Sequence, residues 1–189
     1  MKIGAVSDSH KNTTNLQKAF EYLRDVENID LMIHLGDDYS DVSGLERFTI
    51  PFIGNRRVPI LKVPGVYDPE YKDPAITNRM IKEYEGWKTL ITHTPGSHEN
   101  DLPQDVNPDL VSQSLGVKII LHGHTHIPSI EEKKNIFFIN PGHLKEDDNR
   151  GYPPSFAVLD VSREEVQVKI LSLNNHKEIN QFSILSITE

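Results

Sequence analysis

The chain has 189 residues, 37% of them hydrophobic and 25% charged, which is typical of one globular domain spanning residues 1–189. It contains no cysteine, which excludes disulfides and thiolate metal sites. The formal net charge of -8 argues against an extended nucleic-acid surface, because such a surface needs a positive face. No apolar run approaches the ~20 residues of a membrane-spanning helix, and Met1 leads into strand residues without a signal-peptide pattern. A cytoplasmic protein that does not bind membranes is therefore expected.

The first part of the chain predicts a strand–helix–strand unit. Residues 3–7 form a short apolar strand that ends where Asp8 begins. Residues 12–14 supply helix-capping side chains, and an i, i+3, i+4, i+7 apolar stripe follows over residues 16–26. Residues 31–35 form a second apolar strand. This order favours a parallel α/β core in which the loops after the strands carry function.

The rest of the chain predicts a further α/β portion and then antiparallel strands. We expect strands over residues 60–63, 87–92 and 117–121, and helices over residues 74–84, 107–116 and part of 40–57. Residues 129–139 predict a β-hairpin, and residues 155–173 predict a second pair of strands. The second half is therefore expected to be richer in antiparallel pairing than the first.

Potential metal ligands stand in four short clusters, each directly after a predicted strand. They are Asp8 and His10, then Asp37, then His93, and finally His124 and His126. Each cluster alone is a weak signal, since Gly-Asp is ordinary turn chemistry and a lone histidine at a strand end is more often structural. Their joint order indicates a metal site, because carboxylates and imidazoles suit divalent first-row cations.

The order Asp-x-His, Gly-Asp, His, Gly-His-x-His resembles that of the calcineurin-like metallophosphoesterase family, and especially its short prokaryotic phosphodiesterase branch. The resemblance runs from Met1 to about Asp160. It implies an α/β fold of two packed mixed β-sheets flanked by helices, a four-layer α/β/β/α sandwich. It also implies a metal-dependent hydrolase that cleaves phosphodiesters through a hydroxide bridging two divalent ions, which could be Mn, Fe, Ni, Co or Zn. In this assignment Asp8, His10 and His126 hold the first metal, His93 and His124 hold the second, and Asp37 bridges both.

One expected ligand is missing. The family carries a Gly-Asn motif whose asparagine binds the second metal, and in the favoured placement Val66 stands in that position. Gly54-Asn55 is a rival placement that comes earlier in the chain. If Val66 is correctly placed, the second site keeps three protein ligands and should hold its metal weakly, with water or Asp68 filling the gap.

No strong general acid is visible in the sequence. Tyr67 stands where larger relatives have a histidine after the motif asparagine, and Pro95 stands where the family often has a second histidine. A phenol is a reluctant proton donor at neutral pH. Tyr67 and His98 remain the secondary candidates for a catalytic role, and the expected substrates are those with acidic leaving groups.

The other histidines receive different predictions. His34 and His122 lie inside apolar runs and are expected to be packed and hydrogen-bonded. His143 follows Asn-Pro-Gly, where the family usually has serine, and it is a candidate for lining the pocket. The loops over residues 94–106 and 146–154 are the expected pocket rim.

Two classes of function fit these observations. The first is a phosphodiesterase that acts on a small phosphodiester or nucleotide-like substrate. The alternative is a protein of the same fold with impaired catalysis, acting as a scaffold or nucleotide-binding protein through protein partners. Val66 and Pro95 favour the alternative, whereas the retention of all six aspartate and histidine ligands favours the enzyme.

Overall fold

The strand–helix–strand unit predicted at the start of the chain is present. The structure, a computed structural model, describes residues 1–48, 57–110, 115–148 and 150–186. Strand β1 (Lys2–Val6) pairs in parallel with β2 (Leu31–His34), and helix α1 (Thr13–Asp25) connects them. The side chain of Asn12 caps α1 by accepting a hydrogen bond from the backbone N–H of Asn15, at 3.0 Å.

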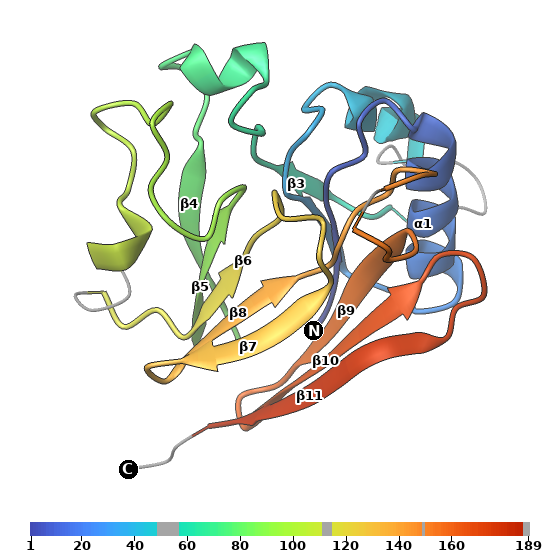
Figure 1. The fold of residues 1–189 in the computed structure, drawn as a ribbon. Helices are drawn as coiled ribbons and strands as arrows, with labels where there is room; N and C mark the ends of the chain where they lie inside the picture. Colours follow the sequence, from blue (N-terminus) through green and yellow to red (C-terminus); the bar gives the residue numbers. More distant parts are fainter. Residues whose placement is uncertain (49–56, 111–114, 149, 187–189) are drawn as a thin grey trace.

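The strands form two mixed β-sheets (Figure 1). The first has the order β11-β10-β9-β1-β2-β3, whose further members are β3 (Ile60–Lys62), β9 (Ser155–Val161), β10 (Glu165–Ser172) and β11 (Glu178–Leu185). The second has the order β4-β5-β6-β8-β7, with β4 (Arg79–Tyr84), β5 (Trp87–Thr92), β6 (Ile119–Leu121), β7 (Ser129–Lys133) and β8 (Ile136–Asn140). Parallel pairs β1–β2 and β2–β3 lie beside antiparallel β9–β11 in the first sheet, and parallel β5–β6–β8 lies between antiparallel β4 and β7 in the second.

The largest apolar cluster lies between the two sheets. Ile3, Ile33 and Leu35 from the first sheet and its loops share this cluster with Ile91 and Leu121 from the second. A second cluster lies on the other face of the first sheet, where the buried stripe of α1 packs; its α1 members are Leu16, Ala19, Phe20 and Leu23. Alternate residues of β1 therefore face opposite cores, as strand geometry requires.

Helices are few in the part of the chain that the structure describes. They are α1, two 3-10 helices at Asp41–Phe48 and Pro69–Lys72, and a helical turn at residues 108–110. None of the helices found in these ranges has the length and apolarity needed to cross a membrane. The predicted pair of mixed sheets is confirmed. The predicted outer helix over residues 107–116 includes residues 111–114, which lie outside the described ranges, so a fourth layer stays a prediction.

The predicted helix over residues 74–84 is wrong, because residues 79–84 form strand β4 of a hairpin with β5. The two residues between these strands, Glu85 and Gly86, have φ of 51° and 92°. Two consecutive positive φ values are what a two-residue hairpin turn needs. Strand β11 was also not predicted, because most of its side chains are exposed and only Ile184 is buried.

Candidate metal centre

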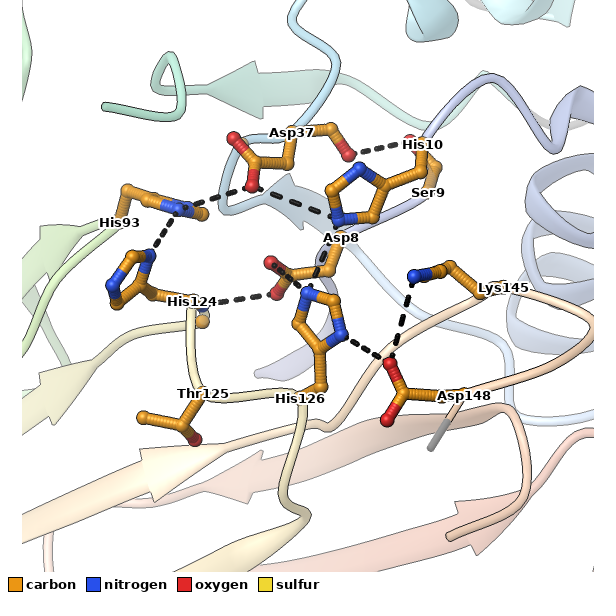
Figure 2. Close-up of polar contacts among 12 residues, drawn as sticks. Asp8, Ser9, His10, Asp37, His93, His124, Thr125, His126, Lys145 and Asp148 are labelled. Carbon is orange, nitrogen blue, oxygen red and sulfur yellow. Dashed lines mark hydrogen bonds and ion pairs between the residues drawn. The ribbon is translucent and has the colours of Figure 1, made fainter. Parts of the chain in front are cut away.

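The loops that follow β1, β2, β5 and β6 meet at one edge of the sandwich (Figure 2). All six predicted ligands come together there: Asp8 and His10 after β1, Asp37 after β2, His93 after β5, and His124 and His126 after β6. Three of these side chains come from each sheet. The carboxyl ends of the parallel strands therefore deliver the side chains to one place, as the sequence predicts.

The first group consists of Asp8, His10, Asp37 and His126, each with one potential ligand atom within 4.8 Å of the others. His10 Nε2 lies 3.1 Å from His126 Nε2 and 3.7 Å from Asp37 Oδ2, and His126 Nε2 lies 3.3 Å from Asp8 Oδ1. Asp8 is fully buried, and within the described residues its Oδ1 has no hydrogen-bond partner. A buried carboxylate oxygen without a donor, facing imidazole nitrogens, fits a divalent cation.

The second group adds His93 and His124 to Asp37. His93 Nε2 lies 3.5 Å from Asp37 Oδ2 and 3.3 Å from His124 Nδ1. The same oxygen of Asp37 is thus close to His10 in the first group and to His93 in the second. This position between the groups suits a carboxylate that bridges two cations.

Hydrogen bonds behind the site orient two of the imidazoles. His93 Nδ1 lies 2.7 Å from the carbonyl oxygen of Leu35, and His126 Nδ1 lies 2.6 Å from Asp148 Oδ2. A carbonyl and a carboxylate only accept hydrogen bonds, so in each ring Nδ1 carries the proton. The Nε2 atoms then point at Asp37 and Asp8 with their lone pairs free for a metal.

Asp148 is a site residue that the sequence reasoning missed. It belongs to an acidic run, and such runs are usually solvated, yet only 1% of its side chain is exposed and Lys145 Nζ lies 3.6 Å away (Figure 2). Burial acts to raise its pKa, but the hydrogen bonds from His126 and from the backbone N–H of Arg150, with the charges of His126 and His143, together hold the pKa of Asp148 well below its usual value. The sequence signal is the position of this acidic run within a loop expected at the pocket rim.

We expect Asp148→Asn to weaken metal binding by about 10- to 100-fold, because the substitution removes the charge that fixes the ring of His126. Isothermal titration of metal-stripped protein with Mn²⁺ measures the affinity. Asp147→Asn is the matched control, since Asp147 is exposed on the same loop. Equal affinities in both variants would show that Asp148 does not support the site.

The backbone at the site is unusual. Five of the six candidate ligands have positive φ: Asp8 (53°), His10 (46°), Asp37 (49°), His124 (68°) and His126 (61°). Aspartate and histidine are among the non-glycine residues found in this region, but it is disfavoured for both. Such clusters of left-handed residues are typical of functional sites, where the surrounding structure holds them in place.

Close backbone approach brings the loops after β2 and β3 together. Gly36 has a φ of 105°, and a Cβ on it would lie 2.6 Å from the backbone nitrogen of Gly65 and 2.8 Å from His93 Nδ1. A Cβ on Gly65 would in turn overlap the Asp37 carboxylate. The segment containing Gly65 and Val66 thus lies against the proposed bridging ligand, as the favoured motif placement requires; Gly54 and Asn55 lie outside the described residues.

Val66 is buried, and a valine side chain offers no ligand atom. Asp68, suggested as a substitute, uses its Oδ2 to accept hydrogen bonds from the backbone of Gly65 at 2.7 Å and Tyr39 at 2.9 Å. Burial raises the pKa of Asp68 to about 6. These contacts tie the loops after β2 and β3 together, and coordination by Asp68 stays a prediction.

The remaining candidates lie around the ligand groups. Tyr67 is 71% exposed, and its ring centre lies 5.7 Å from that of His98. The ring centre of His98 is 6.0 Å from that of His124, so His98 adjoins the second group. His143 is fully buried with its ring centre 5.6 Å from that of His126, and its Nε2 lies 3.1 Å from the carbonyl oxygen of Tyr152.

Burial and charge shift the pKa values of the ligands. Burial would raise the pKa of Asp8, but His126 and the nearby His93 outweigh it and lower that pKa. Burial lowers the pKa of His10 and His124, which favours the neutral imidazole that binds metals. Burial also acts to lower the pKa of His126, yet Asp8 and Asp148 together raise it.

His34, in β2, and His122, directly after β6, are both buried, as expected. Burial lowers the pKa of each from 6.5 to about 4. His34 Nε2 lies 3.1 Å from Ser9 Oγ, which donates a hydrogen bond to Asp41 at 2.8 Å. This buried chain of hydrogen bonds fixes the loop that carries Asp8 and His10.

We expect the metal-free protein to lose stability as the pH falls from 6.5 toward 4. The unfolded chain, with ordinary histidine pKa values, binds protons in this range that folded His34 and His122 do not accept. Their stabilising contribution is complete above pH 6.5, and its loss amounts to roughly 2 to 3 kcal/mol for each histidine. Urea denaturation at several pH values measures it. His122→Gln should flatten the dependence, and an unchanged slope in that variant would contradict the explanation.

The chain is similar in sequence and in fold to several known proteins. The family model described as a calcineurin-like phosphoesterase superfamily domain matches residues 1–164. The chain is 28% identical over 179 residues to a protein named phosphodiesterase from Methanocaldococcus jannaschii, which covers 90% of this chain and 99% of that protein. The fold is similar to that of YfcE, a phosphoesterase from E. coli, with a TM-score of 0.66, 21% identity, and coverage of 96% of this chain and 98% of that one. It is also similar to Chaetomium thermophilum Vps29, with a TM-score of 0.69, 18% identity, and coverage of 100% and 97%.

Proposed function

Since this chain belongs to the calcineurin-like phosphoesterase superfamily, we propose that it is a metal-dependent phosphodiesterase. The observation that carries the proposal is the position of Asp37 Oδ2, 3.7 Å from an imidazole nitrogen of the first group and 3.5 Å from one of the second. The preference for diesters is supported by the name of the relative that is 28% identical. The expected substrate is a small phosphodiester or nucleotide-like molecule.

The donor set fits two divalent cations. Asp8, His10, His126 and Asp37 would hold one, and Asp37, His93 and His124 would hold the other. Bound cations would supply neutralisation of charge on the phosphoryl oxygens and would lower the pKa of a water molecule that serves as the nucleophile. The two carboxylates offset only half of the charge of two dications, so the loaded site attracts an anionic substrate although the chain has a net charge of -8. Asp148 and the Leu35 carbonyl keep the imidazoles of His126 and His93 aimed at the site.

The test is hydrolysis of bis-p-nitrophenyl phosphate by metal-stripped protein with Mn²⁺, Ni²⁺, Co²⁺, Zn²⁺ or Mg²⁺ added singly. We expect turnover that depends on the metal and is highest with a first-row transition ion, because imidazole prefers these ions to Mg²⁺. Calorimetric metal titration of the same samples reports occupancy. Absence of turnover with metal bound would overturn the proposed phosphodiesterase activity and favour the scaffold or nucleotide-binding alternative.

We also propose that Val66 weakens the second site. We expect the metal titration to show one tight and one weaker site, and Val66→Asn to strengthen the weaker one by about tenfold through an added amide-oxygen ligand. Val26→Asn serves as the control, because Val26 is exposed. Val58 is unsuitable for this purpose, because it belongs to the core. Two equally tight sites in the unaltered protein would contradict this part of the proposal.

A further inference from the structure

The imidazole of His98 is held in one tautomer by its own turn. The backbone N–H of Asn100 donates a hydrogen bond to His98 Nδ1, at 3.1 Å. An acceptor nitrogen carries no proton, so the neutral ring has its proton on Nε2. No partner for Nε2 occurs among the described residues, which leaves this N–H available to a ligand.

The turn that carries His98 is anchored by an ion pair to the buried side chain of Arg79. Asp101 accepts a hydrogen bond from the backbone N–H of His98 at 2.9 Å. Arg79 binds the same carboxylate with both terminal nitrogens, at 2.8 and 2.9 Å, and only 1% of the Arg79 side chain is exposed. Tyr71 Oη donates to the other side of the carboxylate, at 2.6 Å. A bidentate pair whose arginine is buried, and whose carboxylate accepts further hydrogen bonds, fixes the turn better than an exposed pair would.

The anchored turn is also tied to the metal-site segment. The side-chain amide of Asn100 donates a hydrogen bond to the Val66 carbonyl oxygen, at 3.0 Å. The His98 ring stands edge-on to Tyr67 and to His124, with interplanar angles of 90° and 74°. His98 therefore occupies a fixed place beside the second ligand group, close to where a phosphoryl group would bind.

We propose that His98 is a neutral hydrogen-bond donor to the substrate phosphoryl group through Nε2–H, and that Arg79 positions it by holding Asp101. This inference rests on the proposed function. His98 transfers no proton. To act as an acid the ring would need a second proton on Nδ1, and Nδ1 already accepts the hydrogen bond from the Asn100 N–H. The hydrogen bond stabilises charge on a phosphoryl oxygen, and the leaving group departs as an anion without a proton from this residue. The site is consequently suited to diesters with acidic leaving groups.

A series of aryl methyl phosphodiesters, whose phenols differ in pKa, tests the role of His98. We expect His98→Ala to lower kcat/KM by about 10- to 100-fold, and by the same factor for every leaving group. His98→Gln should recover part of the loss, because its amide can donate a hydrogen bond from a similar place. Glu99→Gln, an exposed neighbour, should leave the rate unchanged. A loss that grows with the pKa of the phenol would show a general acid instead and overturn the proposal, as would no loss at all.

Binding of inorganic phosphate separates this inference from the proposed function. We expect His98→Ala to weaken phosphate binding to the metal-loaded protein by about tenfold, as measured by calorimetry. Weakened binding in a protein that does not hydrolyse diesters would overturn the proposed function and keep the donor role of His98. Equal affinities for the variant and the unaltered protein would overturn the donor role even if diester hydrolysis is found.

Nuclear magnetic resonance tests the positioning role of Arg79 and Asp101. Long-range ¹H–¹⁵N correlation should show a single His98 tautomer with the proton on Nε2. Asp101→Asn, which keeps the size of the side chain but loses the charge that binds Arg79, should produce a mixture of tautomers and raise KM more than it lowers kcat. A proton on Nδ1 in the unaltered protein, or an unchanged tautomer and KM in the variant, would overturn the positioning scheme.

Discussion

Asp37→Ala is expected to lower metal-dependent diester hydrolysis by on the order of a thousandfold. The reason is that a single carboxylate oxygen lies near both imidazole groups, 3.7 Å from His10 Nε2 and 3.5 Å from His93 Nε2, so its removal damages two sites at once. Each of the other candidate ligands is assigned to one group only. The measurements are initial rates on bis-p-nitrophenyl phosphate and the number of metal ions bound.

Asp37→Asn accompanies the alanine variant, because it keeps the size of the side chain and removes the negative charge. We expect both variants to fold, and both to bind less metal. Asp160→Asn serves as the control, since Asp160 is an exposed carboxylate on β9. Retention of two bound metals and of most of the activity in Asp37→Ala would show that this residue does not bridge the groups.

Gly65→Ala is expected to disrupt the site through one methyl group. The added Cβ would overlap the Asp37 carboxylate, with 2.7 Å to its Cγ and 2.8 Å to its backbone nitrogen. Because backbone cannot give way as a flexible side chain does, the loops after β2 and β3 must move apart. We expect a loss of stability of about 1 to 3 kcal/mol and a large loss of metal affinity. Chemical denaturation and metal titration measure the two effects.

Gly44→Ala is the matched control, because a Cβ at Gly44 has no heavy atom within 4 Å. Its stability and metal affinity should stay close to those of the unaltered protein. A Gly65→Ala protein with normal metal affinity would mean that the close approach of Gly65 and Asp37 is not required for binding.

The ligands could be predicted because each follows an apolar strand closely in sequence. Asp8 comes two residues after the last residue of β1, and Asp37 comes three after β2. A short distance in sequence between the strand end and the ligand leaves few backbone conformations open. The ligand must therefore lie near the edge of the sheet at which its strand ends. Strand β4 was mistaken for a helix because its hairpin turn, Glu85-Gly86, is a less familiar signal than Asn-Gly or Asp-Gly.

The contacts that support the ligands could not be predicted. Asp148 contacts His126 across 22 residues, and Arg79 contacts Asp101 across 22 residues as well. In the unfolded chain each of these charged side chains can be solvated. Only tertiary packing selects the partner that it contacts in the folded protein. The tautomer of His98 depends in the same way on one backbone N–H two residues away, which the sequence pattern does not specify.

Because the candidate ligands are divided between the two sheets, cations bound to them would connect the sheets. Asp8, His10 and Asp37 extend from one sheet, and His93, His124 and His126 extend from the other. Separation of the two sheets would part each bound cation from at least one of its ligands. Metal occupancy and closure of the sandwich are therefore thermodynamically linked, and a cation at 100 times its dissociation constant adds about 2.7 kcal/mol to the folded state. In a chain without cysteine, bound cations would cross-link the sheets in the way that a disulfide cannot.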